Sequence, residues 1–266
     1  MPPVVETVLA VQFKPLPKLA KVQLSLFWSR YREEWPEVRE AVPLPRQSEQ
    51  FGDAQRWARI GMQLGFAAPP IPTRLQLIGK DGARMLQLQN GALCYNWVGG
   101  QERAYPRYHE TRAAFDAWLG QFRAFLREET LGELEADQWE VTYVNRIPKG
   151  TVWNEPTDWG RLFSNLLVFP PSEAVPMVLE SVSSEWHFVI PEQRGRLHVQ
   201  LQHGREENPG NREILILKLT ARGPIKAEGP ESQRLGEGLD LGHEVIVRSF
   251  AALTSPDAHR YWRKCQ

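Results

Sequence analysis

Residues 74–126 constrain the fold of this chain more than any other stretch, because three alternating segments are followed there by one helical segment. Leucines alternate with polar residues around the turns GKDG and QNG, a period that is typical of half-buried strands. The pair Asn90-Gly91 favours a tight hairpin, in which a type I′ turn needs positive φ at both positions. A helical stripe then follows at Phe115, Trp118, Leu119, Phe122 and Leu126. The sequence therefore predicts three antiparallel strands closed by an amphipathic helix.

The same two periodicities divide the rest of the chain into strands and helices. On the N-terminal side we expect a strand at 4–13, a helix at 18–35 that Pro36 ends, and a crossover at 41–73. On the C-terminal side the expected elements are a strand at 139–143, a short helix at 158–167, strands at 181–190, 195–202 and 213–220, a long helix at 232–253 and a tail helix from Pro256.

These elements come in the same order in both halves of the chain: strand, helix, crossover, strands in hairpin succession and long helix. The sequence thus predicts an α+β fold with two βαβββα-like halves, 1–137 and 138–266, packed into one compact unit. Antiparallel sheet would pack against two long helices, and the halves would be related by a pattern-level duplication. Whether they share one continuous sheet stays open. A ligand or partner would bind on the uncovered sheet face or at the seam between the halves.

Composition disfavours several classes of protein. The 32 Lys and Arg residues equal the 32 Asp and Glu residues, so no global field favours nucleic acid or an anionic membrane. No window approaches the ~20 apolar residues of a membrane helix, and the N-terminus lacks the basic region of a signal peptide. Cys94 and Cys265 form no CxxC pair, which favours a reducing compartment. A cytoplasmic protein with no membrane partner is expected.

Short motifs of known chemistry fail when they are tested. Gly236, Gly238 and Gly242 form GxGxxxG, one residue too long for a dinucleotide loop and preceded by a Pro-rich loop, so we expect a helix entrance. His243-Glu244 begins like a zinc-protease helix, but Val247 occupies the second histidine position. Cys94 lies in an alternating strand and is expected to be a buried small residue.

Three histidines, His187, His198 and His203, fall in neighbouring predicted strands and invite a metal hypothesis. Their spacing is not diagnostic and no Asp or Cys joins them, so exposed sheet histidines are the favoured interpretation. The sequence predicts no catalytic residue, no metal site and no cofactor.

The candidate binding residues are Asn96, Trp97, Tyr105, Arg107 and Tyr108. Arginine can stack on rings and bind carboxylate or phosphate, and aromatic side chains supply stacking surface. Such a group could hold a peptide, a nucleotide or a single-stranded end. The favoured alternative is packing, in which the aromatic residues close the helix onto the sheet and Arg107 stacks across them.

Several segments together resemble a family of sporadically distributed bacterial proteins of about this length. They are PPVVETVLAVQF, the LQ…NW strand pair, YPRY, EVTYVNRIP and GHEVIVRSFAALT. The resemblance covers nearly the whole chain and implies a single unit without an established activity. Because the family is patchily distributed, it implies a mobile-element or antiviral defence context. Its motifs fall on Glu6, Asn96, Trp97 and 105–108.

The sequence therefore favours a non-catalytic binding protein, accessory or regulatory in a bacterial defence or mobile-element locus, that binds a protein partner or a small ligand. The alternative is an enzyme or effector whose site assembles only in three dimensions, from Arg107, the sheet histidines and Glu6. A weaker alternative is a nucleic-acid binder that uses a saddle-like sheet, which the balanced charge disfavours.

Overall fold

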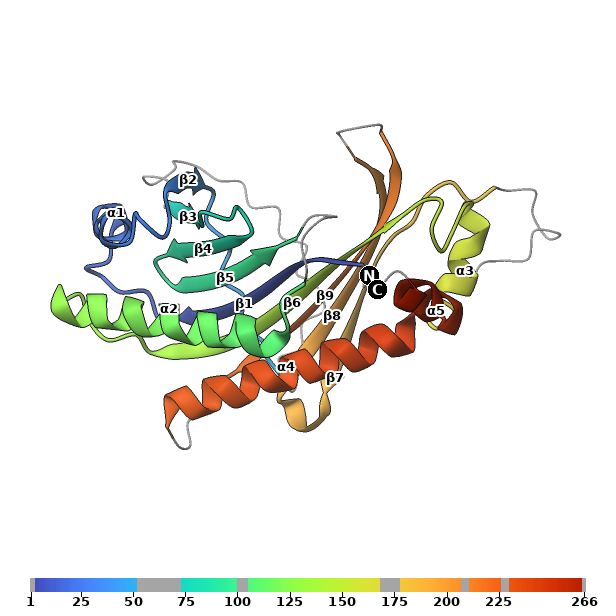
Figure 1. Ribbon diagram of the computed structural model, residues 1–266. Helices are drawn as coiled ribbons and strands as arrows, with labels where there is room; N and C mark the ends of the chain where they lie inside the picture. The colour runs from blue at the N-terminus through green and yellow to red at the C-terminus, as the bar shows by residue number, and fades with distance from the viewer. Residues whose placement is uncertain are drawn as a thin grey trace, which may run out of the picture.

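The computed structural model describes residues 3–51, 73–99, 105–167, 178–206, 211–225 and 230–264. In these ranges all strands form one antiparallel sheet in the order β2-β3-β4-β5-β1-β6-β9-β8-β7 (Figure 1). The strands are β1 (Val4–Phe13), β2 (Glu37–Ala41), β3 (Arg74–Ile78), β4 (Arg84–Gln89), β5 (Ala92–Val98), β6 (Ala136–Pro148), β7 (Ser183–Ile190), β8 (Gly195–Arg205) and β9 (Glu213–Pro224). Because β1 pairs with β6 at the centre, the two halves of the chain share one continuous sheet.

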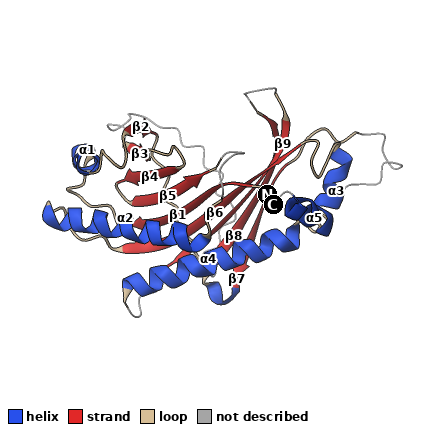
Figure 2. Ribbon diagram, viewed as in Figure 1, coloured by secondary structure: helices blue, strands red, loops and turns tan. Residues whose placement is uncertain are grey.

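Both long helices, α2 (Tyr108–Glu128) and α4 (Glu231–Leu253), lie on the same face of the sheet (Figure 2). Helix α2 contacts β5 and β1, whereas α4 contacts β6 and β9. The shorter helices are α1 (Lys21–Arg30), α3 (Trp159–Leu162) and α5 (Pro256–Lys264). The expected α+β class is confirmed. None of the helices in the described ranges combines the length and the apolar character that a bilayer crossing needs.

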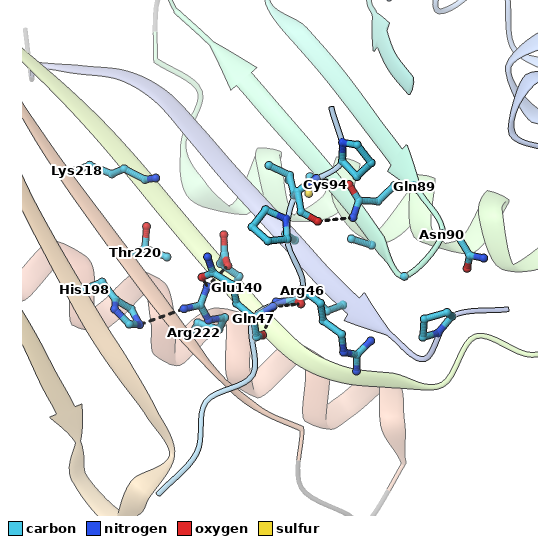
Figure 3. A pocket seen from close by; sticks show the side chains of 18 of the residues that line it. Arg46, Gln47, Gln89, Asn90, Cys94, Glu140, His198, Lys218, Thr220 and Arg222 are labelled. Atoms are coloured by element: carbon cyan, nitrogen blue, oxygen red, sulfur yellow. Dashed lines mark hydrogen bonds and ion pairs between the residues drawn. The ribbon is translucent and has the colours of Figure 1, made fainter. Parts of the chain in front are cut away.

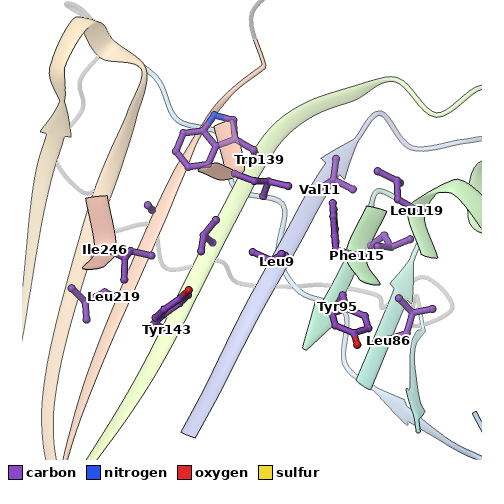
Figure 4. Packing of buried hydrophobic residues seen from close by; sticks show 14 of the residues in the cluster. Leu9, Val11, Leu86, Tyr95, Phe115, Leu119, Trp139, Tyr143, Leu219 and Ile246 are labelled. Atoms are coloured by element: carbon purple, nitrogen blue, oxygen red, sulfur yellow. The ribbon is translucent and has the colours of Figure 1, made fainter. Parts of the chain in front are cut away.

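The main core fills the space between the helices and the sheet. In Figure 4, Trp139 and Tyr143 of β6 lie on the same side of the sheet as Ile246 of α4. Glycines of neighbouring elements surround the Trp139 indole: a β-carbon on Gly238 would lie 2.3 Å from the indole, and one on Gly223 would lie 2.6 Å from it. Gly238 and Gly242 therefore lie inside α4, not at the helix entrance that the sequence predicted, and they let the helix approach a tryptophan.

Residues 42–51, here called the strap, cross the other face of the sheet. Two glutamine side chains hold the strap backbone through paired hydrogen bonds: Gln89 with Leu44 at 2.8 and 2.9 Å, and Gln12 with Gln47 at 3.0 and 2.9 Å. The face that we expected to be uncovered is thus bridged across its middle by the strap.

Four local expectations differ from the structure. The short helix expected at 158–167 spans only Trp159–Leu162, as α3. The helix expected at 18–35 ends at Arg30, and a turn follows that buries Trp35. Strand β2 was missed because its sequence EVREA is short, polar and lies at the sheet edge. The hairpin at Asn90-Gly91 is present, but only Gly91 has a positive φ, of 103°. Most of the crossover, 52–72, lies outside the described residues.

Candidate functional site

Asn96 and Trp97 are neighbours in β5 and therefore project to opposite faces of the sheet. Trp97 points toward the helices, is only 6% exposed, and packs edge-on against Tyr105 with ring centroids 5.3 Å apart. Asn96, 2% exposed, lies on the strap side and donates a hydrogen bond to Oε1 of Glu6 at 2.6 Å. The structure therefore separates Asn96 from the other candidate binding residues.

The helix side of the sheet carries a chain of hydrogen bonds between aromatic residues. The hydroxyl of Tyr105 lies 3.1 Å from the hydroxyl of Tyr143, which lies 2.8 Å from Nδ1 of His243. These residues come from the segment before α2, from the central strand β6 and from α4. The chain therefore fastens the two halves of the protein together at their seam.

Tyr108 completes this arrangement from the first turn of α2. Its ring stacks on His243 with centroids 3.9 Å apart and an interplanar angle of 0°. Its hydroxyl donates a hydrogen bond to Asp240 at 2.7 Å, and Arg112 donates to the same carboxylate at 2.8 Å. Because Asp240 accepts both bonds, the phenol is held in one orientation beside α4.

These residues line a pocket of about 500 Å³, here called the seam pocket. It lies between the start of α2, the middle of α4 and the paired ends of β1 and β6. Its lining consists of Val4, Tyr105, Arg107, Tyr108, His109, Tyr143, Asn145, His243, Ile246, Val247 and Phe250. Arg107 is exposed at the helix start, and within the described ranges its guanidinium has no hydrogen-bond or ion-pair partner. The seam pocket thus combines an apolar wall with one unpaired cation.

Burial determines the protonation of the polar groups in this pocket. It raises the pKa of Tyr143 well above its usual range, and the neighbouring Tyr105 adds to the shift. Burial, and then the hydrogen bond to Asp240, raise the pKa of Tyr108 in the same direction. Burial lowers the pKa of His243, against the opposing charges of Asp240 and Glu244. At neutral pH the two phenols and the imidazole are therefore uncharged, and Arg107 supplies the pocket's positive charge.

A second cavity of about 420 Å³ lies on the opposite face, between the strap and the strands (Figure 3). At its edge Glu49 of the strap is almost completely buried, and it accepts hydrogen bonds from Arg222 at 2.9 and 3.0 Å and from Nε2 of His198 at 2.7 Å. Burial alone would raise the pKa of Glu49, but the bond to His198 and the charge of Arg222 outweigh it and lower this pKa to about 2. Glu49 is therefore a carboxylate that fixes the strap.

The other residues that the sequence singled out lie away from the seam pocket. His187 and His198 face each other on the strap side, whereas His203 points to the helix side and packs on Trp159 at a centroid distance of 4.8 Å. Cys94 is buried, and burial raises the pKa of its thiol to about 12, so it is no nucleophile at neutral pH.

Sequence reasoning found Tyr105, Arg107 and Tyr108 but missed Tyr143 and His243. Tyr143 entered only as part of the strand expected at 139–143, and His243 was tested only as part of a zinc motif. The sequence offered one indication: a buried tyrosine hydroxyl or histidine nitrogen needs a hydrogen-bond partner, so each of these residues must meet another polar group in the fold. Nothing in the spacing indicates that partners 100 residues apart meet.

Comparison with known proteins adds no further assignment. The sequence matches no model of a known protein family, and a search among curated proteins finds no similar sequence.

Proposed function

We propose that this chain is a non-catalytic binding protein that holds an anionic group with an apolar body in the seam pocket. The observation that carries this proposal is Arg107 at the rim of the pocket, whose guanidinium has no partner among the described residues. The polar ends of Tyr105, Tyr143 and His243 deeper in the pocket already bond to one another. A ligand would therefore find an apolar wall and one free charge. A volume of about 500 Å³ suits a small molecule or one large side chain of a protein partner.

The chemistry of the rim favours a carboxylate or phosphate as the anionic group. Arginine presents a planar set of donors that match these groups in pairs. Arg107 precedes the first turn of α2, where the free backbone N–H groups and the helix dipole also favour an anion. Val247, 46% exposed, extends the apolar surface beside this rim.

The enzyme alternative draws on residues that lie apart in the structure. Arg107 lines the seam pocket, Glu6 bonds to Asn96 on the strap side, and His187 lies on the edge strand β7. These groups form no shared site, so this combination supports no catalytic mechanism.

The proposed duplication of the two halves suggests why the seam pocket occurs in one half and not in the other. Outward from the centre, β1 is followed by β5, β4 and β3, and β6 is followed by β9, β8 and β7. The matching order of strands on the two sides supports a duplicated unit, and among the described residues β2 has no counterpart. The segment 105–108 stands before α2, whereas the corresponding stretch before α4 carries no such cluster. Function would then lie where the halves differ.

A role in a bacterial defence or mobile-element locus is proposed on the family resemblance alone, with a protein partner that carries the anionic group. Proteins that co-purify from the native host would test this part, since a partner encoded beside the gene is expected.

The pocket itself is tested by an NMR titration with N-acetyl-tryptophan, which joins an aromatic body to a carboxylate. We expect the signals of His243 and Val247 to shift in a saturable manner. Signals from the strap cavity, such as His198, serve as the internal control. Shifts at the control alone, or no saturable shift, would exclude the seam pocket as the binding site.

A further inference from the structure

We infer that Glu185, His187 and His198 form a binding site for a divalent transition metal such as Zn²⁺, at the wall of the strap cavity. One ligand atom from each residue lies within 4.8 Å of the other two. Imidazole nitrogens with a carboxylate oxygen are ligands that Zn²⁺ prefers. This inference does not rest on the seam pocket, which lies on the other side of the sheet.

The register of two strands brings the three residues together. His187 of β7 pairs directly with His198 of β8, and Glu185 pairs with Gln200 two residues along. Residues two apart in a strand point to the same face, so all three ligands project to the strap side. Nδ1 of His187 lies 2.7 Å from Nδ1 of His198. Tetrahedral zinc would need these two nitrogens to separate to about 3.3 Å, a shift that an exposed edge strand can make.

Glu49 fixes the tautomer of His198 that metal binding needs. Glu49 also accepts from Arg222 and pairs with Arg196, so its carboxylate acts as an acceptor, and the 2.7 Å contact with Nε2 of His198 places the proton on Nε2. Nη2 of Arg222 lies 3.3 Å from the same nitrogen, but it donates to Glu49 as well. In the neutral ring Nδ1 therefore carries the lone pair, which accepts from Nδ1 of His187 at 2.7 Å and would bind the metal once the two rings separate. A carboxylate behind a histidine ligand is the usual second partner in zinc sites.

Glu185 is held in the same manner, since the side-chain amide of Gln200 donates to its Oε1 at 3.1 Å. Both strap-side arginines close to the site are compensated: Arg196 pairs with Glu49, and Arg222 pairs with Glu49 and Glu140. The charges of these two arginines are therefore balanced by carboxylates. Glu185 and His198 also line the strap cavity, so a fourth coordination position would face that cavity.

The test is isothermal titration of the tag-free full chain, stripped with a chelator, with Zn²⁺. We expect one equivalent bound at micromolar affinity or tighter. His187→Ala and Glu185→Gln should each weaken binding at least tenfold. Both side chains are about half exposed, at 41% and 46%, so these variants should fold normally, which circular dichroism checks. Replacement by Co²⁺ should give the visible absorption band of a tetrahedral site.

The exposed His109 on α2 supplies the matched control, since His109→Ala removes an imidazole far from the site and should leave the affinity unchanged. Binding that is absent, that exceeds one equivalent without saturating, or that survives in both ligand variants would overturn the inference. A loss of binding in His109→Ala equal to that in His187→Ala would overturn it as well.

Discussion

The hydroxyl of Tyr143 lies 2.8 Å from Nδ1 of His243, and this contact joins the central strand β6 to helix α4. Burial keeps the phenol protonated, so Tyr143 donates and the imidazole nitrogen accepts. Protonation of His243 at Nδ1 would replace this acceptor with an N–H group, so the Tyr143 hydroxyl could no longer donate to it. The seam pocket therefore depends on a neutral His243.

Stability should decrease in mild acid because of this histidine. Folding lowers the pKa of His243 below its ordinary 6.5, so the unfolded chain binds the proton first as the pH falls. Its contribution to the free energy of unfolding decreases from pH 6.5 downward and levels off below the folded-state pKa. Urea unfolding between pH 7.5 and 5.0 should show this decrease, and His243→Asn should reduce it.

Some loss of stability in mild acid should remain in His243→Asn. Burial also lowers the pKa of His259, so protonation of this second histidine destabilises the fold as the pH falls as well. The groups that face His243 are Tyr143, Tyr108, Asp240 and Glu244. An unchanged slope in His243→Asn would show that the imidazole is not held neutral by the fold.

Trp97 and Arg107 should respond in opposite ways to truncation. Trp97→Ala removes a buried indole and should cost about 3–5 kcal/mol of unfolding free energy. Arg107→Ala removes an exposed side chain without a partner among the described residues and should stay within about 0.5 kcal/mol of wild type. Chemical denaturation of both variants measures this difference. A large loss of stability in Arg107→Ala would mean that the arginine is part of the packing.

Gly238 and Gly120 offer a matched pair of glycines within long helices. A β-carbon on Gly238 would lie 2.3 Å from Trp139, whereas one on Gly120 would meet nothing within 4 Å. Alanine gains helix propensity at both sites, so Gly120→Ala should stabilise by about 0.5–1 kcal/mol. Gly238→Ala should instead destabilise by about 1–3 kcal/mol because the core is overpacked.

Thermal unfolding of these two variants gives the comparison. Equal stabilisation of both would mean that Trp139 can move away from α4 at no cost, and that the glycines have no packing role.

Glu49 should be essential for fixing the strap. Glu49→Gln leaves Arg222 and Arg196 without their shared buried counter-ion and should cost about 3 kcal/mol. Glu37→Gln breaks an exposed pair with Arg39 and should cost less than about 0.5 kcal/mol. Limited proteolysis should cleave near the strap faster in Glu49→Gln only. Equal stability of the two variants would contradict this assignment.

Much of the fold could be predicted because hydrophobic periodicity and turn-forming residues can be recognised within short stretches of sequence. The strands and the helix of 74–126 were found from alternation, a hairpin pair and an apolar stripe. Strand β2 was missed since a short polar edge strand has no such pattern. Helix α1 was overextended because Tyr31 and Trp35 continue its apolar stripe, although the chain has already turned.

The site could be predicted only in part. Tyr105 and Tyr108 are close in sequence, so their shared place at a helix start was visible. The strand period could have separated Asn96 from Trp97, since neighbours in a strand face opposite ways. Tyr143, His243 and Glu49 reach their partners through tertiary contacts across 100 or more residues, and no local pattern encodes such contacts.

The most direct test of the seam pocket compares N-acetyl-tryptophan with N-acetyl-tryptophanamide, which differ by the carboxylate alone. We predict that the wild-type protein prefers the acid over the amide by about 1.5–3 kcal/mol, the range of a hydrogen bond to a charged group. Arg107→Gln should remove most of this preference, since only the helix start then favours the anion, and should leave the affinity for the amide unchanged. If the variant keeps the wild-type preference for the acid, Arg107 does not bind the anion and the proposed function is wrong.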